Sequence, residues 1–152
     1  MSGRLPPYLG DRLRLPVIAA PMLRVSGPDL VKAACAAGVV GAFPTANART
    51  VAELDEWLDE IGDAATGSTA PHAPNLIIRQ PRMPRDLEVL VRHRVEVVIT
   101  SVGSPAEVVG PLHEVGTLVL ADVATLRHAH RAVEAGADGL VLLTAGAASA
   151  PS

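Results

Sequence analysis

The stretch LPVIAAPMLRVSGPDLVKAACAAGVVGAFPTAN, residues 15–47, decides the fold of this chain. It begins with an apolar run at residues 17–20 and ends with a second one at 39–42. Between these runs, Pro28 suits the first position of a helix and Gly38 suits the position after its last turn. Four apolar residues of that helix would share one face: Leu30, Val31, Ala34 and Cys35. Neither apolar run alternates with polar residues, which is typical of strands covered on both faces in a parallel sheet.

The same unit recurs along the chain, with a repeat of roughly 21 residues that is typical of βαβ units. Six apolar runs are predicted to be strands: residues 17–20, 39–42, 76–78, 97–99, 118–120 and 140–143. A helical pattern follows each of the first five runs. The sequence therefore predicts an α/β fold with a parallel sheet.

Local signals mark where several helices begin and end. Thr50 and Glu53 fit a capping box, and Ser104 and Glu107 fit a second one with Pro105 at the first helical position. Three apolar stripes at helical spacing are expected to be buried: Leu54, Trp57, Leu58 and Ile61; Leu87, Leu90 and Val91; and Leu126, Ala129 and Val133. Residues 62–74 are rich in Ala, Thr, Ser, Gly and Pro, so they are predicted to be a surface loop.

Two architectures fit this order of elements, a parallel barrel and an open doubly wound sheet. No G-x-G-x-x-G follows the first predicted strand, which disfavours the dinucleotide-binding form of the open sheet. A complete (β/α)8 TIM barrel has eight units and typically ~250 residues. The sequence therefore predicts an incomplete parallel (β/α)8 TIM barrel in which about six βα units are present.

Composition disfavours several classes of function. The 152 residues are 49% apolar and carry a net charge of -3, so a core is available but no concentrated basic face for nucleic acid. No apolar run reaches the ~18–20 residues that a membrane span requires. The first residues do not resemble a signal peptide, so a cytoplasmic protein is expected. Cys35 is the only cysteine, and His128 and His130 would face different directions on a helix, so no metal site is expected.

The predicted strand ends and the segments around them resemble one family. Residues 15–61 are similar to the opening of nitronate monooxygenases, formerly called 2-nitropropane dioxygenases. The resemblance continues in order through four segments: PNLI at 74–77, VVITSVG at 97–103, ADVATLRHAHRAVEAGADGL at 121–140 and LLTAGA at 142–147. It covers nearly the whole chain after Arg14, and the ordered set is more specific for the family than for a substrate.

The resemblance implies a barrel that binds FMN non-covalently and oxidises alkyl nitronates or nitroalkanes with O₂. In such proteins the flavin supplies the redox chemistry, while the chain binds, orients and excludes water. By position, seven residues would bind the cofactor: Ala20, Pro21, Met22, Asn47, Asn75, Asp122 and Gly146. The first three would lie against the flavin ring, Asn75 would hydrogen-bond its polar edge, and Gly146 would begin the turn that approaches the ring and the phosphate.

The residues themselves leave other roles open for four of these candidates. Met22 also suits the filling of a hydrophobic core. Asn47 and Asn75 also suit turns, and Asp122 also suits the cap of the helix that follows it. The family usually continues as A-G-A-G-G-H-A-G, where the His acts as a base on neutral nitroalkanes. Ala150 stands at that position here, so no catalytic side chain is assigned.

The resemblance and its departure together define one expected domain. We expect residues 1–152 to form a truncated FMN-binding barrel domain, with a lead-in at 1–14 and a divergent tail at 145–152. The glycine-rich segments that hold the FMN phosphate in the family have no counterpart in the sequence, so weak FMN binding is expected. The expected partners are a small nitronate or nitroalkane and O₂, with no nucleic acid and no membrane, and association into a homo-oligomer stays open.

Two alternatives stay open at this point. Another FMN-dependent barrel oxidoreductase, such as an enoyl reductase, shares the early Ala-Pro-Met pattern. A chain without the phosphate site could also be a non-catalytic fragment or a scaffold that pairs with another chain.

Overall fold

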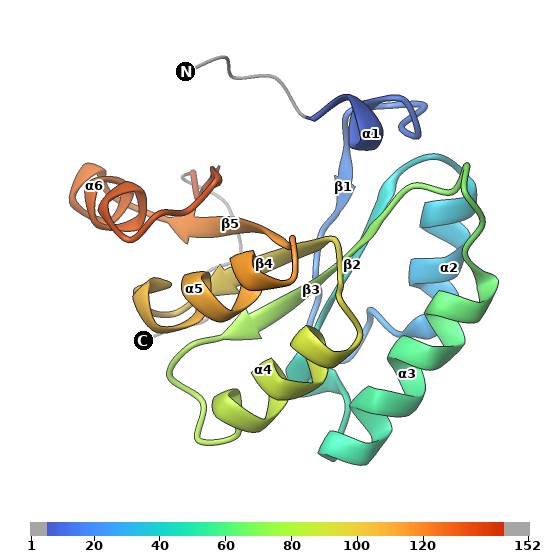
Figure 1. Ribbon diagram of the computed structural model, residues 1–152, viewed down its shortest axis with the longest axis horizontal. Coiled ribbons are helices and arrows are strands. Elements are labelled where there is room, and N and C mark those ends of the chain that lie inside the picture. The colour runs from blue at the N-terminus through green and yellow to red at the C-terminus, as the bar shows by residue number, and fades with distance from the viewer. Residues whose placement is uncertain (1–5, 145–152) are drawn as a thin grey trace.

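A computed structural model describes residues 6–144 of the chain. Six parallel strands form one sheet in the order β1-β2-β3-β4-β5-β6, so that each strand pairs with the next one in sequence. The sheet curls, and the helices that connect the strands lie along its outer side (Figure 1). The predicted incomplete parallel barrel is therefore confirmed.

The elements alternate regularly along the chain. The strands are β1 (Ile18–Ala19), β2 (Val40–Pro44), β3 (His72–Ile77), β4 (Val97–Ser101), β5 (Leu118–Val123) and β6 (Gly139–Leu142). The helices are α1 (Pro7–Gly10), α2 (Pro28–Ala36), the 3-10 turn η1 (Thr45–Asn47), α3 (Val51–Ala64), α4 (Met83–Arg92), α5 (Ala106–Glu114) and α6 (Leu126–Glu134).

Both faces of the sheet are apolar, because successive residues of a strand point to opposite sides. On the outer face, Phe43, Leu76 and Val98 pack under the helices in one large cluster. On the inner face, Ala73 of β3 and Ile99 of β4 pack in a second cluster with residues of β2 and β5. Burial on both sides explains why the strands read as continuous apolar runs in the sequence.

The lead-in before β1 covers the inner face at the end where the strands begin. Leu9 of α1 is buried, and Leu13 packs with it against the inner cluster. The Arg12 Nη1 atom donates to Glu96 Oε1 over 3.0 Å, and its Nη2 atom donates to Oε2. Glu96 directly precedes β4, so this bidentate ion pair fixes the lead-in to the middle of the sheet.

The predicted loop at residues 62–74 is wrong at both ends. Helix α3 continues to Ala64, and β3 already begins at His72. Pro74 lies within β3, in register with Phe43 of β2. The composition of residues 62–74 is typical of a loop, and proline is rare in central strands because it has no backbone N–H to donate, yet residues 72–74 pair with β2.

The capping predictions have mixed outcomes. Thr50 accepts a hydrogen bond from the backbone N–H of Glu53 over 3.0 Å, as predicted. The second box is wrong, because Ser104 accepts from Ala106 N over 3.4 Å and not from Glu107. Helix α5 begins one residue later than that box requires, since the carbonyl of Pro105 accepts its first helical bonds.

The stripe predicted for α6 is also wrong. Leu126 and Val133 are 82% and 55% exposed, whereas Ala132 is buried. Ala132 packs on Ala121 and Val123 of β5. The small alanine therefore lets the helix lie close to the sheet, and the larger side chains point away from it.

Two glycines give a matched test of how closely α2 and the sheet approach. A Cβ atom on Gly41 would lie 2.7 Å from the Val31 carbonyl oxygen, whereas a Cβ on Gly62 in α3 meets nothing within 4 Å. We expect Gly41→Ala to lower the free energy of unfolding by about 1–3 kcal/mol through overpacking. We expect Gly62→Ala to raise it by about 0.5–1 kcal/mol through helix propensity. Urea unfolding curves measure both, and effects of the same sign would contradict the packing of α2 on β2.

Candidate functional site

Three polar side chains follow the inner apolar cluster at the carboxyl ends of neighbouring strands. Ala73, Ile99 and Leu120 face inward, and the residues two positions later are Asn75, Ser101 and Asp122. Because a strand repeats every two residues, these three share the inner face of β3, β4 and β5. Ligands of parallel barrels bind at this end of the strands, so this is the candidate site.

Asn75 is held inside the barrel by its neighbours on β4. It is 6% exposed, and its Oδ1 atom accepts from the Ser101 hydroxyl over 3.1 Å. Its Nδ2 atom donates to the Ile99 carbonyl over a long 3.4 Å. An amide nitrogen has two donor hydrogens, so Asn75 retains donor capacity at a buried, oriented position.

Asp122 is half-buried on β5. Its carboxylate makes no hydrogen bond or ion pair with any other residue of the part described, 6–144. Burial raises the pKa of this carboxyl above its usual range. Asp122 does not cap α6, since Thr125 does so by accepting from His128 N over 3.1 Å. Among the described residues, this carboxyl group is therefore available to a ligand.

A pocket of about 440 Å³ lies beside these residues. It is lined by Ser101 and the turn that follows β4, by the end of β5, and by α6. Arg79, His128 and Arg131 contribute polar and basic groups to its lining, and Asp122 is the single acid in it. The volume lies within the usual range for small-molecule sites, roughly 300–1,000 Å³.

The loop between β1 and α2 carries Ala20, Pro21 and Met22. Met22 is 45% exposed, so its thioether chain lies open at the end of β1. The buried hydroxyl of Ser26 accepts from Met22 N over 3.0 Å and donates to the Ala20 carbonyl over 3.4 Å. The loop therefore folds back on Ser26, a residue that the sequence analysis did not single out.

Asn47 binds this same loop. Its Nδ2 atom donates to the carbonyls of Met22 and Ser26 over 2.9 and 2.8 Å, and its Oδ1 atom accepts from Arg24 N over 2.9 Å. These bonds connect residues more than twenty positions apart, so no local sequence signal could reveal them. Asn47 therefore shapes the loop that carries Met22, and its contact with a ligand stays a prediction.

Two sequence candidates, Gly146 and Ala150, lie outside the described residues. Within residues 6–144, no three His, Cys, Asp or Glu side chains gather closely enough to hold a metal ion. None of the described helices combines the length and hydrophobicity that crossing a bilayer requires.

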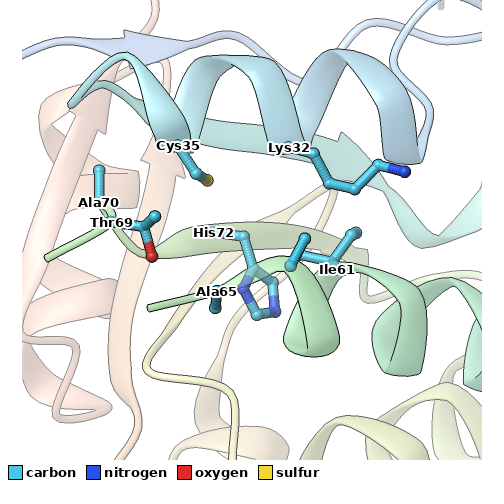
Figure 2. A pocket seen from close by; sticks show the side chains of 8 residues that line it. Lys32, Cys35, Ile61, Ala65, Thr69, Ala70 and His72 are labelled. Carbon is cyan, nitrogen blue, oxygen red and sulfur yellow. The ribbon is translucent and has the colours of Figure 1, made fainter. Parts of the chain in front are cut away.

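A second, much smaller pocket lies on the far side of the sheet, between α2, α3 and the start of β3. Figure 2 shows the His72 ring directed into it, with Cys35 and Lys32 on the opposite wall. Its volume is about 20 Å³, enough for roughly one water molecule. The Cys35 thiol is buried and donates to the Pro71 carbonyl over 3.5 Å, and burial raises the pKa of this thiol. The prediction that Cys35 is a small buried residue is confirmed.

The free carboxyl group of Asp122 gives a test of the site's electrostatics. A carboxyl group whose folded-state pKa is raised disfavours folding once the pH exceeds its unfolded pKa, because the folded state holds the proton more tightly. We expect Asp122→Asn to raise the melting temperature at pH 7 and to have little effect near pH 3. Thermal scans at the two pH values measure the change in melting temperature. Asp63→Asn, at an exposed position of α3, is the control. A lower melting temperature at pH 7 would show that the carboxylate has a stabilising partner.

Comparisons with known proteins agree with the fold. No protein-family model matches the chain, and no curated protein matches it. Among solved structures, FabK from Thermotoga maritima has a TM-score of 0.77 and 26% identity, and 88% of this chain aligns with 41% of that one. The nitroalkane oxidase from Streptomyces ansochromogenes has a TM-score of 0.75 and 27% identity, with coverages of 88% and 47%. A native KDPGal structure, at 24% identity and a TM-score of 0.61, shares the fold. The chain therefore spans less than half the length of FabK and of nitroalkane oxidase, and across that span it is similar to both.

Proposed function

We propose that this chain forms the ring-binding part of an FMN-dependent oxidoreductase that oxidises alkyl nitronates with O₂. The observation that carries the proposal is the inner-face group Asn75, Ser101 and Asp122, which lies at the ligand-binding end of the barrel. The ordered sequence resemblance to nitronate monooxygenases and the similarity to nitroalkane oxidase support the same chemistry.

The described residues fit the ring side of a flavin. Asn75 offers a buried amide with unused donor capacity, which suits a ring edge that carries hydrogen-bonding atoms. Met22 offers an open, polarisable side chain, which suits contact with the face of an aromatic ring. Bound FMN would supply electron transfer from the nitronate to O₂, and the chain would orient the ring and keep water away. Gly146 would contact the cofactor from beyond the described residues.

The proposal is tested by titrating the chain with FMN and with riboflavin while following flavin fluorescence. We expect a dissociation constant for FMN above about 1 µM, which corresponds to a binding free energy weaker than about -8.2 kcal/mol, since the described residues proposed to hold the flavin would contact its ring. Asn75→Leu should weaken binding of both flavins at least tenfold, whereas Ser68→Leu in the exposed loop before β3 should not. Unchanged fluorescence up to millimolar flavin would reject the cofactor assignment for this chain.

An FMN-dependent enoyl reductase is the second candidate. The Ala20-Pro21-Met22 pattern is shared with that class, and the similarity to FabK is as close as that to nitroalkane oxidase. Oxygen consumption with propyl-2-nitronate and NADH oxidation with an enoyl thioester separate the two reactions. Nitronate-dependent oxygen consumption by the flavin-loaded chain supports the first proposal, and thioester-dependent NADH oxidation supports the second.

The remaining partners follow from this proposal. A small nitronate and O₂ would be the substrates, with neither nucleic acid nor membrane involved. A chain that binds no flavin and pairs with another polypeptide would instead support the non-catalytic scaffold.

A further inference from the structure

Arg82 directly precedes α4, at the ligand-binding end of the barrel, and its side chain contacts the η1 turn. We propose that Arg82 is a positioning residue: it holds the η1 turn on both sides of Asn47, and through Asn47 it fixes the loop that carries Met22. The consequence for a flavin rests on the proposed function, whereas the positioning of the loop does not.

The first step is the pair of hydrogen bonds from Arg82 to η1 and the residue after it. Its Nη2 atom donates to the Thr45 carbonyl over 2.7 Å, and its Nη1 atom donates to the Ala48 carbonyl over 2.8 Å. These two carbonyls flank Asn47 in the chain, so both ends of the turn are tied to the start of α4. A planar guanidinium can make such a double contact, whereas an ammonium group cannot reproduce its geometry.

The second step is the anchoring of Arg82 itself. Its Nε atom lies 2.8 Å from Oδ1 of Asp86, one turn further along α4. The Asp86 side chain is 1% exposed and that of Arg82 is 22% exposed. A buried carboxylate beside a guanidinium restricts the Arg rotamer, because leaving that charge unpaired would be costly. Asp86 therefore directs the two Nη groups of Arg82 at the turn.

The third step is the transfer from Asn47 to the Met22 loop. Asn47 makes three hydrogen bonds to that loop. In one of them, its Oδ1 atom accepts from the backbone N–H of Arg24. Arg24 has a φ of +63°, a left-handed conformation that a non-glycine residue keeps only where its surroundings hold it. The bonds from Asn47 supply that restraint, so displacement of η1 should release Arg24 and then Met22.

The test is amide hydrogen exchange of the full chain without flavin, so that its result does not depend on the proposed function. Arg82→Lys keeps the positive charge but cannot make both hydrogen bonds to Thr45 and Ala48. The pair Arg82→Met with Asp86→Leu removes the ion pair without leaving a buried charge, which protects folding. In both variants we expect the Arg24 amide to exchange about tenfold faster, the value of roughly one hydrogen bond. Amides in the middle of β4, such as that of Ile99, should keep their rates.

Two controls separate positioning from general stabilisation. Arg85→Lys alters an exposed arginine of the same helix and should leave Arg24 exchange unchanged. In an Asn47→Ala background, Arg82→Lys should add no further acceleration, because the effect passes through Asn47. Faster exchange to the same degree at Arg24 and Ile99 would make the role of Arg82 merely structural and overturn the proposal. An unchanged Arg24 rate in both Arg82 variants would also overturn it.

Should the exchange result hold, flavin titration of the same variants gives the consequence at the site. A weakening of flavin binding that is matched by Met22→Ala supports the route through the loop. A chain that shows the exchange effect but binds no flavin leaves the positioning intact and rejects only the proposed function.

Discussion

Below pH 6.5 the chain is expected to lose stability steeply, and His72 is expected to be a main cause. Burial lowers the pKa of His72 from its ordinary value of 6.5 to about 4, and its Nε2 atom has no hydrogen-bond partner among the described residues. The unfolded state then binds a proton at a higher pH than the folded state does. The stabilising contribution is therefore complete above pH 6.5, declines as the pH falls and is absent below about 4. Its full size is about 3 kcal/mol.

Urea unfolding at pH 7, 5.5 and 4.5 measures this contribution as a difference between two proteins. His72→Leu removes the titrating group, so the variant should lose less free energy of unfolding across this range than the natural chain. His130→Leu on the exposed side of α6 is the matched control and should follow the natural chain. Parallel pH dependence in the natural chain and the His72 variant would contradict the assignment.

The 152-residue chain expressed alone is expected to associate at micromolar concentration. Within residues 6–144, β1 and β6 each pair with a single strand, so each presents an open edge. On the outer side near β6, Leu126 is 82% exposed and Leu142 is 67% exposed. Unpaired edges and grouped apolar side chains both favour contact between chains.

Light scattering over a range of concentrations gives the mean mass. The double variant Leu126→Glu with Leu142→Lys should lower that mass towards the monomer, since charges at an edge oppose association. Leu30→Glu, at a 41% exposed leucine on α2, should not. A monomer at every concentration, or an equal effect of the control, would show that this surface does not drive association.

The order and direction of the strands were predictable because they follow from local signals. Apolar runs, Thr50 at a helix start and Gly38 at a helix end, where φ is +79°, each report the backbone around them. The start of the strand at His72–Ile77 was not predictable in this way, because the Ala-, Thr-, Ser-, Gly- and Pro-rich composition before Asn75 is typical of a loop. Pairing with β2 outweighs that local composition.

The candidate site was predictable only in part, and the reason is distance along the chain. The placement of Asn75 and Asp122 at the same end of the sheet, on the two strands that flank β4, follows from the barrel pattern. The bonds from Arg82 to Thr45 and from Asn47 to Met22 join residues 37 and 25 positions apart. Such pairs depend on how whole units pack, which no periodicity or cap describes.

The ion pair between Arg12 and Glu96 also bears on how the protein is made. These two residues are 84 positions apart. At about 5–20 residues per second, a ribosome would need roughly 4 to 17 seconds to reach Glu96 after adding Arg12. During that interval Arg12 lacks its carboxylate partner, and Leu9 has no completed inner cluster to enter. This early segment therefore docks only once Glu96 and the strand after it have emerged, and until then it is exposed to chaperones and proteases.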